Sequence, residues 1–113
     1  MPIIHKIGEF YKNFYKLKKN IDKINRYGIY KQIEELILIV YEISIEASLS
    51  SKNQKVQILQ KLRIKIEVIK KLVRLINEIN VIDLKKYLNL EKDLIEISKM
   101  ATSWQKYFIN KES

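Results

Sequence analysis

Residues 59–76 read LQKLRIKIEVIKKLVRLI, and this stretch decides the fold because its apolar side chains recur at helical spacing. Steps of three and four residues place one set of them on a single face of an α-helix. This set comprises Leu59, Leu62, Ile66, Ile69, Val73 and Ile76. We therefore predict a helix over about residues 52–80 that turns this face toward a core.

Three other segments repeat the same spacing and predict three more helices. A first helix over about residues 3–21 has the apolar positions Ile7, Phe10, Phe14, Leu17, Ile21 and Ile24. A second over about 27–49 has Ile29, Ile33, Leu36, Val40, Ile43 and Ala47. The last has Tyr87, Leu90, Leu94, Ile97, Ala101, Trp104 and Phe108.

Short connections separate these helices, at about residues 20–28 and 48–51. Ser51 with Gln54 fits a capping box at the start of the third helix. Asp83 fits an N-cap of the fourth, where its carboxylate meets the positive helix end.

Composition supports an all-α fold in one domain. The chain has 113 residues with two Gly, one Pro and 47% hydrophobic residues, which argues against a β-rich fold with many tight turns. Four long helices with short connections predict an antiparallel, up-down-up-down four-helix bundle that spans residues 1–113.

The net charge of +9 is distributed unevenly and suggests a polyanionic partner, most simply RNA or DNA. Residues 51–82 hold eight Lys or Arg against two acids, whereas residues 27–50 are net acidic. Four cations of the third helix lie within about 40° on a helical wheel and define a basic ridge. The basic ridge consists of Lys52, Arg63, Lys70 and Arg74. Lys16 and Lys19 of the first helix are further candidates for phosphate contact.

Several alternatives to nucleic-acid binding stay open for these residues. The cations could pair with the acidic second helix, solvate the bundle or reflect a drift toward Lys in an AT-rich genome. Tyrosines near the basic end of the first helix could stack on unpaired bases or pack at the edge of the core. They are Tyr11, Tyr15, Tyr27 and Tyr30.

Apolar residues outside the core positions predict a homo-oligomer. Ile64, Val68 and Leu75 form a second stripe on the third helix, and Leu38 and Ile45 lie off the core face of the second. One core leaves such residues without a partner, so we predict that they form an oligomer interface. The alternative is a wide core-facing stripe with scattered surface aliphatics.

Residues for catalysis or metal binding are scarce, so we expect no enzyme activity, no metal and no cofactor. The chain has no Cys and a single histidine, His5. It lacks the Glu-x-x-His pairs of di-iron bundles and any Ser-His-Asp arrangement. The first residues do not resemble a signal peptide, and the longest apolar run, 36–41, is too short to span a membrane. We predict a cytoplasmic protein without membrane contact.

Short elements along nearly the whole chain resemble one family in the same order. They are the opening MPIIHKI, Arg26-Tyr27, residues 32–34 (QIE), 46–48 (EAS), Lys55 with Leu59, 72–75 (LVRL), Tyr87, and 96–100 (EISKM) with Trp104. Together they resemble Avd, the accessory variability determinant of diversity-generating retroelements. They also resemble the four-helix-bundle proteins encoded in 23S ribosomal RNA intervening sequences. Ser98, Lys99, Thr102 and Ser103 replace the Gly, Arg, Gly and Gly of the usual C-terminal signature, as in a divergent member.

The resemblance to Avd implies a non-enzymatic partner of a reverse transcriptase. Family members form a homopentamer with a basic surface that binds nucleic acid, and they support mutagenic cDNA synthesis and retrohoming. Lys70 and Arg74 match positions where the family has basic residues, so the resemblance implies nucleic-acid binding for both. The alternatives are an intervening-sequence protein with a structural or RNA-associated role, and a protein-interaction adaptor with drifted charge.

Overall fold

The computed structural model describes residues 1–112, and all the secondary structure of the described chain is helical, without strands. Four long helices are α1 (Pro2–Lys16), α3 (Ile29–Leu49), α4 (Lys52–Glu78) and α5 (Leu84–Glu112). Between α1 and α3 lie a short 3-10 helix, η1 (Leu17–Asn20), and one helical turn, α2 (Lys23–Arg26). The prediction of an all-helical bundle is confirmed.

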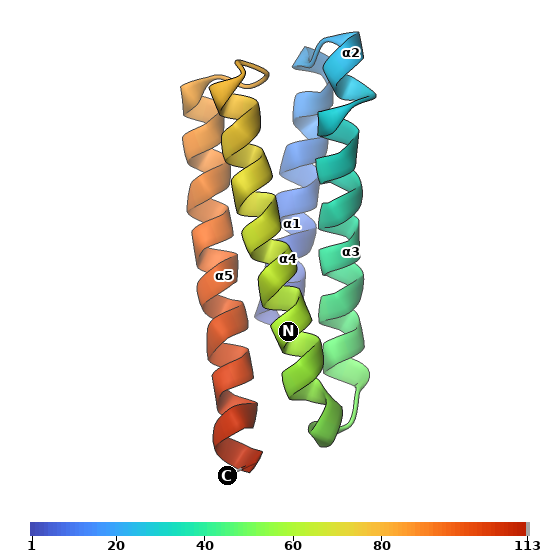
Figure 1. Ribbon diagram of the computed structural model, residues 1–113, viewed down its shortest axis with the longest axis vertical. Helices are drawn as coiled ribbons and strands as arrows, with labels where there is room; N and C mark the ends of the chain where they lie inside the picture. Colours follow the sequence, from blue (N-terminus) through green and yellow to red (C-terminus); the bar gives the residue numbers. More distant parts are fainter. Residues whose placement is uncertain (113) are drawn as a thin grey trace.

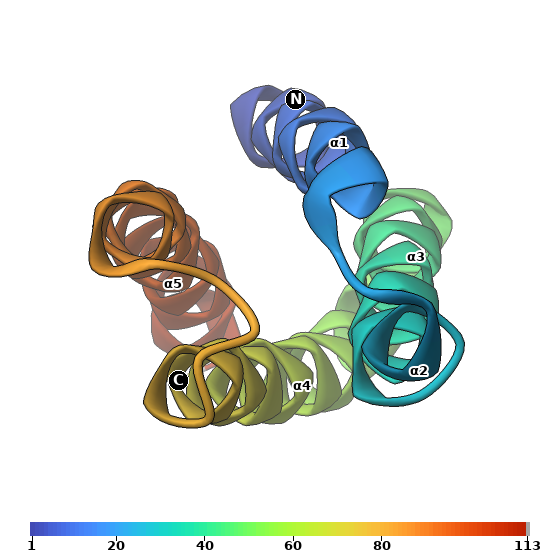
Figure 2. The same ribbon diagram turned by 90° about the horizontal axis from the view of Figure 1, so that it is seen from above.

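The long helices lie side by side in an elongated molecule of 49 × 21 × 19 Å (Figure 1). Seen from above, α1 and α4 occupy opposite corners, and α3 and α5 occupy the other two (Figure 2). Contacts between neighbouring helices join an early position of one helix to a late position of the other. Lys6 meets Asp93 and Glu96 of α5, whereas Leu17, further along, shares a surface hollow with Lys86. Between α4 and α5, Arg63 contacts Gln105, whereas Arg74, further along α4, acts on Tyr87 near the start of α5.

One apolar core fills the space between these helices. All six apolar positions predicted for the third helix are buried in α4, and the predicted positions of the other helices are buried or partly buried, with one exception. Ile24 is 85% exposed, so its assignment to the core was wrong. It lies in α2, where the chain has already turned away from the axis of α1.

Tyr30 adds an aromatic contact to the core. Its ring stacks on Phe14 with centroids 4.4 Å apart, and its hydroxyl donates a hydrogen bond to the Phe14 carbonyl oxygen. Burial raises the pKa of Tyr30 above its usual value, and the Glu34 charge adds to this shift. Because the ring is fully buried, Tyr30 is not available to stack on a base.

The helix ends follow local side-chain chemistry, with one departure from prediction. Asp83 caps α5, since its Oδ1 accepts a hydrogen bond from the Lys86 backbone N–H at 2.8 Å. Ser51 does precede α4, but its hydroxyl lies 2.6 Å from Asn53 Oδ1 and gives no side-chain cap, so the capping box with Gln54 was wrong. The nearer Asn53 side chain takes the hydroxyl proton instead.

The connection from α4 to α5 is a compact turn. Asn80 has φ 64°, the left-handed conformation that asparagine tolerates better than most residues. The Val81 N–H bonds the Ile76 carbonyl and the Asn80 N–H bonds the Asn77 carbonyl, which is the hydrogen-bond pattern of a Schellman motif. Within the described chain, no helix combines the length and apolar character needed to cross a bilayer.

Candidate nucleic-acid and partner interface

Arg63 places the basic ridge on the side of α4 that adjoins α5, because it contacts Gln105 of α5 and the other three residues share its helix face. Lys52 is the first residue of α4, and Arg74 follows 22 residues later, so the ridge extends about 33 Å along the helix at 1.5 Å per residue. The structure therefore aligns these residues along one edge and does not gather them at one point.

Arg63 contributes to packing between α4 and α5. Its Nη1 donates to Gln105 Oε1 at 2.5 Å, and Gln105 is buried. The Gln105 amide nitrogen in turn donates to the Val56 carbonyl at 3.1 Å and to Gln60 Oε1 at 2.9 Å. Arg63 thus has a partner inside the bundle. This partner is the side-chain amide of Gln105 on α5, and not an acid of α3.

The upper ridge residues, Lys70 and Arg74, have different surroundings. Lys70 pairs with Glu67 one turn away, at 3.1 Å. Arg74 is exposed and forms no ion pair within residues 1–112. Burial and a hydrogen bond with Glu91 raise the pKa of Tyr87, while the Arg74 charge opposes this shift. Of the two upper ridge residues, Arg74 is therefore the one without an acidic partner among residues 1–112.

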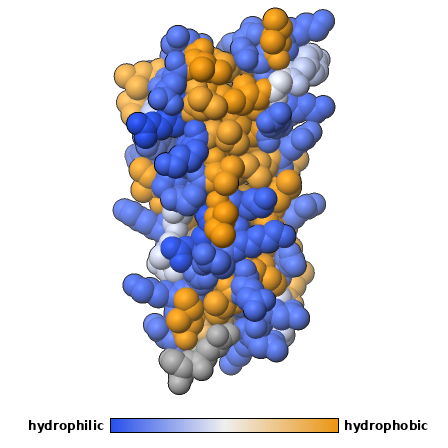
Figure 3. Space-filling model, viewed as in Figure 1, coloured by the Kyte–Doolittle hydropathy of each residue, from blue (hydrophilic) through white to orange (hydrophobic). Residues whose placement is uncertain are grey.

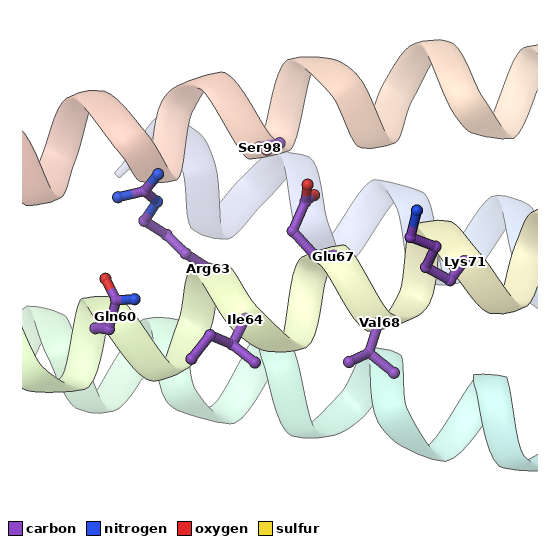
Figure 4. A pocket seen from close by; sticks show the side chains of 7 residues that line it. All are labelled: Gln60, Arg63, Ile64, Glu67, Val68, Lys71 and Ser98. Carbon is purple, nitrogen blue, oxygen red and sulfur yellow. The ribbon is translucent and has the colours of Figure 1, made fainter.

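A hollow of about 410 Å³ opens on the outer side of α4 beside α5 (Figure 4). In Figure 4, Arg63, Glu67 and Lys71 point toward α5, whereas Ile64 and Val68 point away from it. Gln60 and Ser98 complete the lining. The hollow joins the basic ridge to the apolar stripe. Lys71, which the helical-wheel argument left out of the ridge, lies between the two on the helix surface.

Ile64, Val68 and Leu75, named here the outer apolar stripe, are 41% to 54% exposed on α4. Figure 3, which has α4 in front, shows apolar residues gathered in the upper middle of this face with hydrophilic residues on both sides. Leu38 is exposed and Ile45 is half-buried on α3. They lie one turn beyond Glu34, which contacts Lys18 of η1, and Tyr41, which lies against Gly8 of α1, so they belong to a different side of the bundle.

Lys16 and Lys19 lie apart from the basic ridge, where α1 passes into η1 and α2. With Tyr15, Lys18 and Arg26 they line a hollow of about 400 Å³. Since α1 and α4 occupy opposite corners of the bundle (Figure 2), the six predicted cations form two separate sites. Spacing along the chain could not have paired Arg26 with Lys16, because the intervening turn sets their relative positions.

Among the described residues, no group of three or more His, Cys, Asp or Glu side chains could hold a metal ion. His5 is exposed and contacts Glu9 at 3.9 Å.

Comparison with known proteins identifies a family for this arrangement. A family model described as bAvd-like matches residues 1–108, and no curated protein or solved structure matches the chain. The match spans α1, α3, α4 and all but the last four residues of α5, and it agrees with the resemblance to Avd seen in the sequence. The chain belongs to the bAvd-like family.

Proposed function

We propose that this protein is a non-enzymatic accessory subunit of a diversity-generating retroelement. It binds nucleic acid and a reverse transcriptase, and it supports mutagenic cDNA synthesis and retrohoming. Catalysis then resides in the reverse transcriptase. The observation that carries this proposal is the outer face of α4 in a bAvd-like chain, where a basic ridge and an apolar stripe border the same hollow.

Charge on the upper half of α4 supports the nucleic-acid part of the proposal. Lys70, Lys71 and Arg74 lie within about one helical turn, and within residues 1–112 only Lys70 of these three has an ion pair, with Glu67. A cation that meets a phosphate releases counterions, so its contribution to affinity depends on salt. The planar guanidinium of Arg74 also suits bidentate contact with a phosphate.

The two apolar patches support a homo-oligomer. Leu38 and Ile45 lie on one side of the bundle, and the outer apolar stripe lies on another. Two different faces that meet between successive copies make a head-to-tail interface, which closes into a ring when the rotation fits. This geometry suits the homopentamer that the resemblance to Avd implies.

Binding across a salt series tests the nucleic-acid part. Labelled structured RNA and duplex DNA should bind the purified protein with an affinity that falls steeply as salt rises. Arg74→Glu should weaken this binding, whereas Lys92→Glu on α5 makes the same charge change away from the ridge and should have the smaller effect. Light scattering of the same samples gives the oligomeric state. A monomer indifferent to both nucleic acids contradicts the proposal.

The reverse transcriptase part needs its own test. A reverse transcriptase gene beside this one, and co-purification of its product with this protein, would support the retroelement role. A gene placed inside a ribosomal RNA insertion, with no reverse transcriptase bound, would favour the intervening-sequence alternative.

A further inference from the structure

We propose that the corner where α1 passes into α2 holds an unpaired segment of nucleic acid, with its phosphates on basic side chains and a base on Tyr15. This inference rests on the proposed nucleic-acid binding, but it concerns a site separate from α4. It assigns to the protein a preference for single strands at this corner.

The corner contains two adjoining hollows that share Tyr15 and Lys16. The first, of about 400 Å³, is also lined by Lys18, Lys19 and Arg26. The second, of about 300 Å³, is also lined by Tyr11 and Lys12. We call them together the corner groove. Its lining consists of two tyrosines and five cations, without an acid among the lining residues.

Two of these cations already have acidic partners. Lys18 Nζ lies 3.0 Å from Glu34 Oε2, and this pairing raises the pKa of Lys18. Lys12 Nζ lies 3.3 Å from Glu9 Oε1. By contrast, Lys16 and Lys19 are exposed and have no ion pair within residues 1–112, so they are available to an incoming anion.

Arg26 adds a buried hydrogen-bond donor that is unsatisfied among the described residues. Its Nε is buried and has no acceptor among the described residues. Buried polar groups without a partner are uncommon and unfavourable in folded proteins, so each one calls for an explanation. A phosphate oxygen in the groove would supply the missing acceptor, and it would also be attracted by Lys16 and Lys19.

The tyrosines favour an unpaired strand over a duplex. Tyr15 is 52% exposed, Tyr11 lies beside it with ring centroids 6.2 Å apart, and Lys18 Nζ lies 4.4 Å from the Tyr15 centroid. Exposed aromatic rings beside cations are the usual platform for bases of single strands. A duplex keeps its bases stacked inside and could offer only its phosphates.

The test compares a labelled single-stranded oligonucleotide with a duplex of the same sequence by fluorescence anisotropy. Tyr15→Ala should weaken single-strand binding at least about fivefold, the low end for loss of one stacked base, and should leave duplex binding within twofold. Tyr107→Ala is the matched control, because Tyr107 is similarly exposed on α5 and has Lys111 Nζ 5.4 Å from its ring. Circular dichroism checks folding, and Tyr15→Leu serves as a second variant that keeps apolar bulk.

A salt series tests the binding of phosphates by the two lysines. Replacing both Lys16 and Lys19 with Gln should reduce the dependence of log affinity on log salt for the single strand by about 1.4, or about 0.7 for each phosphate that is no longer neutralised. Equal effects of Tyr15→Ala and Tyr107→Ala would overturn the inference. So would displacement of the strand by an acidic peptide as readily as by unlabelled oligonucleotide, because the groove would then recognise acidic protein.

The two proposals can fail separately. If Arg74→Glu weakens duplex binding while every corner variant binds the single strand like wild type, only the corner inference is wrong. If wild-type protein binds neither nucleic acid, both proposals fail.

Discussion

Replacing Gln105 with Leu should destabilise the bundle by removing a polar junction between α5 and α4. The buried Gln105 side chain takes part in three hydrogen bonds, with the Val56 carbonyl, Gln60 and Arg63. A neutral hydrogen bond contributes about 0.5–1.5 kcal/mol net, and one to a charged group about 1.5–3 kcal/mol. Much of this is recovered, because Gln60 and Arg63 can turn to water and the leucine buries more apolar area. We expect a net loss of about 2 kcal/mol.

Thermal unfolding measures this loss directly. A change of about 2 kcal/mol should lower the Tm by about 8 °C in a domain of this size. All variants are compared at one protein concentration, because assembly would make the Tm depend on concentration. Gln32→Leu on the surface of α3 is the matched control and should change the Tm by less than about 2 °C.

A double-mutant cycle then separates the contribution of Arg63. Arg63→Met should cost about 1.5 kcal/mol in the wild-type background and almost nothing when Gln105 is already Leu. Equal costs in both backgrounds would refute the assignment of Arg63 to this junction. An unchanged Tm in Gln105→Leu would refute the junction as a source of stability.

Three further predictions concern assembly, charge and the last turn. Val68→Asp should raise the oligomer dissociation constant at least about tenfold, since it removes apolar burial and places a carboxylate in the interface. Light scattering on dilution measures this constant, and the control variant Ile24→Asp should leave it unchanged. Glu34→Gln should reduce the free energy of unfolding at pH 7 by at most about 1 kcal/mol. Pairing with Glu34 raises the pKa of Lys18. The higher stability of wild type over Glu34→Gln should therefore persist below about pH 10. It should vanish in thermal melts as the pH rises through that raised pKa. Asn80→Ala should cost about 1 kcal/mol in urea unfolding because of its positive φ, whereas Asn80→Gly should cost nothing.

Periodicity predicted the helices and the core because both depend on local spacing. In α4, residues three and four apart share a face whatever lies opposite. The burial of the six apolar core positions between Leu59 and Ile76 could therefore be foreseen. The cap at Asp83 is equally local, since its acceptor reaches an N–H three residues away. Ile24 failed because periodicity carries no information about where the helix axis bends.

Contacts between distant segments could not be foreseen in the same way. Gln105 is a polar residue that is 3% exposed, and its burial depends on three partners more than 40 residues earlier in the chain. The sequence alone does not distinguish Tyr30 from the other tyrosines near the basic end of the first helix. In the structure, however, Tyr30 stacks on Phe14 in the core. The corner groove forms because Arg26 lies near Lys16. A helical wheel of either segment alone cannot show this proximity.

The connection between α1 and α3 has a consequence for how the bundle opens. Two residues link α3 to α4 and a compact Schellman turn begins the link from α4 to α5, whereas α1 is joined through residues 17–28 and is the shortest of the long helices. Its release would leave three helices in sequence order still packed on one another, so we expect detachment of α1 to be the opening with the lowest free energy. Amide hydrogen exchange should therefore be faster in α1 than in the middle of α4. The surface uncovered by α1 also fits the α1 of a second molecule, so this helix is the segment that would be exchanged in a domain-swapped dimer.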